Sequence, residues 1–76
     1  MSKREQLMEY ITQDIVVFLV DDRKLDYIEA MRLFYTSETY ERVLDEETGL
    51  YLEGSAYIYD ILKTECDHGK LTQIEY

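Results

Sequence analysis

Apolar residues recur at three- and four-residue spacing along the first part of the chain, which is the pattern of one helix face. The stripe runs from about Glu5 to about Asp22. Its β-branched run, Ile15–Val20, read alone would also suit a buried strand. Its phase continues that of the preceding residues, and no second strand of comparable quality is present to pair with it. The pattern therefore predicts a helix over residues 5–22, with these residues inward: Leu7, Met8, Ile11, Ile15, Phe18 and Leu19.

An acidic capping box predicts a second helix over residues 27–36. The Asp26 carboxylate can accept the backbone N–H of Glu29, and the Glu29 side chain can reach back to the N–H of Asp26. A helix that is apolar on nearly every side is normally surrounded by other elements, so we expect this one at the centre of the core. Its apolar residues are Tyr27, Ile28, Ala30, Met31, Leu33, Phe34 and Tyr35.

Two further helix-start signals divide the rest of the chain. Thr36-Ser37 predicts the beginning of a short helix over residues 38–44, and Ser55 is the expected N-cap of a final helix over residues 56–67. Between them, residues 45–54 form an acidic, extended loop in which Gly49 is suited to a positive φ. Gly69 is the expected end signal of the last helix.

These elements predict an all-α fold, a compact bundle of about four helices forming a single domain over residues 1–76. Residues 1–4 and 70–76 are expected to be flexible or loosely docked. The absence of proline favours helices with short connections. A chain of 76 residues buries only about 60–65% of its unfolded surface, so a partner or a second copy would add to a marginal core.

The formal charge of −9 opposes binding to nucleic acid or to an anionic membrane, because both require neutralisation of phosphates. It suits attraction to a basic partner, although acidity can also serve solubility alone. The longest apolar run is too short to span a bilayer, which takes about 20 residues. We expect no targeting segment. The single cysteine, Cys66, cannot form an internal disulfide, which favours a cytoplasmic protein.

Catalytic and metal-binding patterns are weak. Cys66 and His68 are the one pair with metal-ligand chemistry, but structural zinc takes four ligands and the sequence has no further Cys or His. The acidic segment that begins at Asp45 fails as a calcium loop, since Leu50 stands at position 6 and Ala56 at position 12. We therefore expect no cofactor, no metal and no enzymatic activity.

The tyrosines are the remaining signal. Tyrosine joins a large apolar area to a hydroxyl that needs a partner, and it is enriched at interfaces; it also suits the rim of a thin core. Tyr51 and Tyr59 lie off the main stripes, so we expect them to be exposed, surrounded by acidic residues. The candidate interaction surface is Tyr40, Tyr51, Tyr59, Glu46, Glu47 and Glu53.

The block EAMRLFYTSETYERVLDEETGLYLEGSAYIYDILKTE, about residues 29–65, resembles a family of short bacterial proteins known only as a domain of unknown function. The resemblance implies a bacterial, cytoplasmic protein without an assigned activity. It also implies a neighbouring ADP-ribosyltransferase-like protein, for which a small acidic chain would serve as an antitoxin-like partner.

The favoured interpretation is a non-enzymatic interaction module that binds a basic protein. Two alternatives stay open. One is a structural domain that self-associates, for instance as a homodimer. The other is a small enzyme or metal protein that uses Cys66 and His68.

Overall fold

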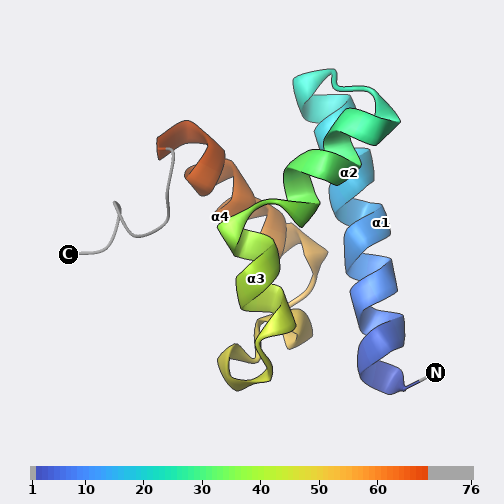
Figure 1. Cartoon of the computed structure of the whole chain (residues 1–76), viewed down its shortest axis with the longest axis vertical. Helices are drawn as coiled ribbons and strands as arrows, with labels where there is room; N and C mark the ends of the chain where they lie inside the picture. Colours follow the sequence, from blue (N-terminus) through green and yellow to red (C-terminus); the bar gives the residue numbers. More distant parts are fainter. Residues whose placement is uncertain (1, 69–76) are drawn as a thin grey trace.

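Four α-helices follow one another in the computed structural model, which describes residues 2–68 (Figure 1). They are α1 (Lys3–Arg23), α2 (Tyr27–Tyr35), α3 (Glu38–Leu44) and α4 (Ser55–His68). Two short 3₁₀ helices, η1 (Glu46–Thr48) and η2 (Leu50–Leu52), connect α3 to α4. Residues 2–68 contain no strand, so the predicted all-α bundle of four helices is confirmed.

The first helix begins at Lys3, earlier than the predicted start at Glu5. The reason is a capping box: Ser2 Oγ accepts the backbone N–H of Glu5 at 3.1 Å, and the Glu5 carboxylate accepts the N–H of Ser2 at 3.0 Å. Residues 2–4, expected to be flexible, thus belong to an ordered helix start. The helix ends at Arg23, and its C-cap Lys24 has a left-handed φ of 59°.

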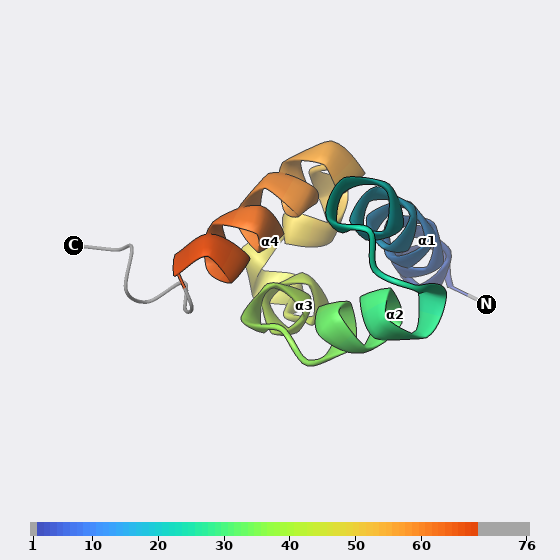
Figure 2. The ribbon, with the colours of Figure 1, turned by 90° about the horizontal axis from the view of Figure 1, so that it is seen from above.

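The second helix begins as predicted but does not occupy the centre of the core. Asp26 and Glu29 form the capping box, with N···O distances of 2.8 and 3.2 Å. Its buried residues are Ala30 and Phe34, whereas Tyr27 is 61% exposed. The nine-residue helix lies between α1 and α3 on the outside of the bundle, so only one of its faces is covered (Figure 2).

The longest helix, α1, is the main packing element instead, and it lies along one side of the bundle (Figure 1). It contacts α2, α4 and η2 (Figure 1). It also contributes four of the core residues, more than any other element. The core consists of Ile11, Ile15, Val16, Leu19, Ala30, Phe34, Val43, Leu50, Ile58, Tyr59 and Leu62.

The connection 45–54 is tightly turned between α3 and α4 rather than extended. The Thr48 hydroxyl donates to the carbonyl oxygens of Arg42 at 2.7 Å and Asp45 at 2.9 Å, which closes the chain on the end of α3. Gly49 then adopts the predicted positive φ, 64°, and places Leu50 in the core. The 3₁₀ turns satisfy backbone groups that an extended segment would leave to solvent.

The predicted N-cap role of Ser55 is also corrected. The α4 helix begins at Ser55 itself, and the carbonyl of Gly54 accepts the N–H of Ile58 at 3.2 Å. The Ser55 hydroxyl donates to Asp14 Oδ2 of α1 at 2.7 Å, so it joins two helices. The expected roles of Gly69 and of residues 70–76 lie outside the described residues. Within residues 2–68, no helix combines the length and apolar character that crossing a bilayer requires.

Candidate functional site

The predicted interaction surface is divided among three places in the fold, and Tyr59 is not exposed. Its side chain is 8% exposed, so the expectation for this residue was wrong. The hydroxyl donates to Asp22 Oδ2 at 2.9 Å, and the ring lies 5.0 Å from that of Phe18, centroid to centroid. Because Asp22 accepts a hydrogen bond from the Tyr59 hydroxyl, the ring can be buried against α1 without leaving a polar group unpaired.

The surroundings of Tyr59 hold it in its neutral form. Burial raises the pKa of the Tyr59 hydroxyl to about 12, and the Asp22 carboxylate adds to the shift. Tyr59 is therefore a structural link between the end of α1 and α4, and it does not present a free surface to a partner.

Tyr51 is half-buried and lies near the other end of α1. The Arg4 guanidinium lies 5.5 Å from the centroid of its ring. Arg4 Nε is 3.4 Å from Glu46 Oε1, and Arg4 Nη2 donates to the carbonyl of Leu44. Tyr51 and Glu46 both lie beside Arg4, which fixes them against the start of α1.

Tyr40 occupies a third place, among aromatic side chains of α2. Its ring is 5.1 Å from that of Phe34 and 5.0 Å from that of Tyr35, both in edge-to-face geometry. Burial raises the pKa of the Tyr40 hydroxyl. Tyr40 is half-buried and faces α1 rather than the acidic loop.

The predicted carboxylates Glu46, Glu47 and Glu53 are exposed on elements that pack against one another. Helix α3 contacts both η1 and η2, and η1 contacts η2, which brings together exposed acids that the chain separates. We define this acidic surface as Glu41, Asp45, Glu46, Glu47 and Glu53. Residues 38–54 contain one base, Arg42, and α1 contributes Arg4. Acids therefore outnumber bases on this surface.

Cys66 and His68 lie in the last turns of α4. Burial raises the pKa of the Cys66 thiol, which is the opposite of what an activated nucleophile requires. His68 is exposed in the last turn of α4. In the described part of the chain, no three His, Cys, Asp or Glu side chains are grouped so that they could hold a metal ion.

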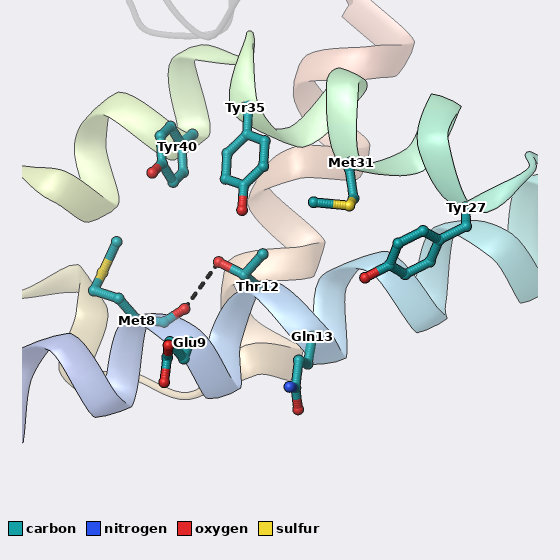
Figure 3. A pocket seen from close by; sticks show the side chains of 8 residues that line it. All are labelled: Met8, Glu9, Thr12, Gln13, Tyr27, Met31, Tyr35 and Tyr40. Carbon is teal, nitrogen blue, oxygen red and sulfur yellow. Dashed lines mark hydrogen bonds between the residues drawn. The ribbon is translucent and has the colours of Figure 1, made fainter.

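A second surface, which the sequence did not reveal, is a groove beside α1. One hollow of about 360 Å³ lies where α1 faces α2 and α3 (Figure 3). Met8 and Thr12 extend from α1 toward Met31, Tyr35 and Tyr40 across it. Its lining therefore combines methionine and tyrosine side chains with polar side chains of α1.

Two further hollows extend this groove along α1. One of about 490 Å³ is lined by Val16, Val17, Val20 and Asp21, and it shares Gln13 and Tyr27 with the first. Another of about 360 Å³ shares Gln13 and Glu9 with the first. We call the three together the α1–α2 groove.

A signal for the groove was present in the run Ile15–Val20. It holds more apolar residues than one helix face can bury, and Val17 is 59% exposed. Exposed apolar side chains that gather on one face are typical of interaction surfaces.

Comparisons of the chain with protein-family models, with curated proteins and with solved structures find no match in any of the three. The function proposed below therefore rests on the contacts and charges of the chain itself.

Proposed function

We propose that the chain is a non-enzymatic interaction module that binds a basic protein. The observation that carries the proposal is the acidic surface formed by α3, η1 and η2. Its carboxylates are exposed and outnumber the bases beside them. Such a surface attracts a cationic partner over several ångströms, speeds its association and disfavours anionic competitors.

The rigidity of this surface supports the proposal. Arg4 holds Glu46 and Tyr51 against α1, and Asp45 Oδ1 accepts the N–H of Glu47 at 3.0 Å. A surface that is already ordered loses less conformational entropy on binding than a mobile loop does.

The family resemblance gives the proposal a more specific form. In that form the chain is a bacterial cytoplasmic protein, and its partner is an ADP-ribosyltransferase-like enzyme that it neutralises. Acidic residues would then face a basic region of the enzyme.

Self-association is the second candidate, favoured by the exposed apolar side chains of α1 and α2. The charge of −9 on each copy opposes it, because two copies repel one another. Light scattering over a range of protein concentrations separates the two candidates.

The test is capture of the partner from a lysate of the source organism with the tagged chain, at low and high salt. We expect a stoichiometric basic protein that is released by high salt. The variant E46Q/E47Q/E53Q should capture less of it. A partner that binds both proteins equally and resists salt would contradict the proposal.

A further inference from the structure

We propose that the α1–α2 groove receives a basic amphipathic helix, contributed by the protein partner. The inference rests on the proposed function, and it names the part of the partner that is bound and the place where it binds. The acidic surface and the groove are distinct, so they can be tested separately.

The dimensions of the groove suit a helix of about four turns. Its lining along α1 extends from Gln6 to Asp21, and this stretch of helix is about 22 Å long at 1.5 Å per residue. A helix of the same length has about 15 residues. It would place one apolar side chain per turn into the groove, at the spacing by which helices dock in grooves.

The lining suits the apolar face of such a helix. Met8 and Met31 lie on opposite walls, from α1 and α2, and methionine adapts its shape to the side chains it meets. Tyr27 and Tyr35 flank Met31 on α2 at four-residue spacing, so all three face the groove. Tyrosine offers both apolar area and a hydroxyl for the polar flank of a ligand.

The charges of the groove select a basic helix. Glu9 and Asp21 line it near its two ends, and the residues that the structure places along the three hollows include no lysine or arginine. Residues 5–22 of α1 contain five acids and no base. A lysine-rich flank would therefore meet carboxylates on α1, whereas an acidic helix would be repelled.

The arginines near the two ends of α1 are engaged elsewhere. Arg4 pairs with Glu46, and Arg23 Nη2 lies 3.1 Å from Asp67 Oδ1 of α4. Neither therefore neutralises the groove. A second copy of this chain is a poorer occupant, because its own charge is −9 and its α1 carries the same acids.

The probe for the test is a synthetic peptide of about 15 residues made of leucine and lysine, with leucine at helical spacing and a fluorescent label. Its binding to the full chain is measured by fluorescence anisotropy. The control peptide has the same composition with leucine and lysine alternating, so it keeps the charge and loses the apolar helix face. We expect the control to bind at least about tenfold more weakly.

Two double variants locate the binding site. V17A/Y27A removes an exposed valine and tyrosine of the groove. L52A/Y57A removes an aliphatic and a tyrosine side chain that are 67% and 53% exposed outside it. We expect V17A/Y27A to weaken peptide binding about tenfold and L52A/Y57A to change it less than twofold.

Two matched lysine substitutions give a second test, in which no side chain is truncated to alanine. Gln13 is exposed at the centre of the groove, and Ala56 is exposed on α4. Gln13→Lys and Ala56→Lys add the same charge, but only the first places it against the peptide. We expect Gln13→Lys to weaken binding several-fold more than Ala56→Lys.

Failure of the groove proposal is distinguishable from failure of the proposed function. If E46Q/E47Q/E53Q loses peptide binding and V17A/Y27A binds as the wild type does, the groove proposal is overturned. The proposal of a basic partner at the acidic surface then still stands. Absence of peptide binding at low salt would also overturn the groove, whereas salt-sensitive capture of a basic protein decides the proposed function. A dimer in sedimentation that V17A/Y27A dissociates would make a second copy the occupant, and this too would overturn the proposal.

Discussion

Thr39 and Glu65 join the beginning of α3 to the last turns of α4: the Thr39 hydroxyl and backbone N–H both donate to Glu65 Oε1, at 2.8 and 2.9 Å. The N–H of Glu38 donates to Glu65 Oε2 at 2.9 Å. A carboxylate from one helix thus satisfies free N–H groups at the N-terminus of another, where the helix dipole favours negative charge.

Removal of the Glu65 carboxylate should destabilise the fold. We expect Glu65→Ala to lower the free energy of unfolding by about 2–3 kcal/mol, since buried donors of α3 lose a charged acceptor. Glu65→Gln should cost less, because its amide keeps one acceptor oxygen. Urea denaturation measures both.

The exposed Asp60 of the same helix provides a control. Asp60→Ala should change the free energy of unfolding by less than about 0.5 kcal/mol. Thr39→Val keeps the shape of the fully buried Thr39 and should cost about 1 kcal/mol. An effect of Glu65→Ala no greater than that of Asp60→Ala would mean that the cap contributes nothing.

The raised pKa of Tyr59 predicts a loss of stability at alkaline pH. The folded chain keeps the phenol protonated up to about pH 12, whereas in the unfolded chain it ionises near the ordinary value of 10. The protonated Tyr59 hydroxyl therefore makes its full contribution to the free energy of unfolding below about pH 10. This contribution is lost as the pH rises to about 12, a change of about 2 kcal/mol. Denaturation of wild type and Tyr59→Phe across this range isolates the effect.

Tyr59→Phe should lower stability at neutral pH by about 1 kcal/mol, because it removes the hydrogen bond to Asp22. The difference between the two proteins should then shrink or reverse as the pH approaches 12, since phenylalanine does not ionise. A difference that stays constant with pH would show that Tyr59 ionises as an exposed tyrosine does.

Arg4 should control the order of the acidic surface. Arg4→Ala removes the contacts to Glu46, Tyr51 and the Leu44 carbonyl together. We expect a loss of about 1 kcal/mol and faster amide hydrogen exchange over residues 46–52. Lys3→Ala, at the exposed neighbouring position, is the control and should leave this exchange unchanged.

Lys24 offers a stabilising substitution. Its φ of 59° is left-handed, a conformation that costs a residue with a Cβ atom about 1 kcal/mol and costs glycine little. Lys24→Gly should therefore raise the free energy of unfolding by about 0.5–1 kcal/mol. Thermal denaturation checks this, and a lower melting temperature would show that the Lys24 side chain contributes more than its backbone costs.

Local signals predicted the helices well. Asp26 and Glu29 marked the start of α2 because a capping box involves two residues three positions apart. Its hydrogen bonds therefore depend on the local sequence alone. Gly49 was assigned correctly for the same reason, since a turn after a helix depends on its own backbone.

Features that depend on the neighbouring helix could not be predicted in this way. Tyr59 lies one residue beyond Ile58, and only the position of Asp22 on α1 shows that the Tyr59 hydroxyl has a hydrogen-bond partner. The groups that donate to Glu65 belong to Glu38 and Thr39 of α3, which are distant in sequence, so no local pattern marks the Glu65 carboxylate as a helix cap. The expected exposure of Tyr59 was therefore wrong, and the groove could not be predicted because side chains of three helices line it.

The measurement that tests the central claim most directly is the affinity of the chain for its captured partner as a function of ionic strength. Calorimetric titration of the wild type and of E46Q/E47Q/E53Q provides it. We expect the wild-type affinity to fall steadily with salt, and the variant to bind more weakly at low salt with a shallower dependence. Equal affinities and equal salt dependence for the two proteins would contradict the claim that the acidic surface binds a basic partner.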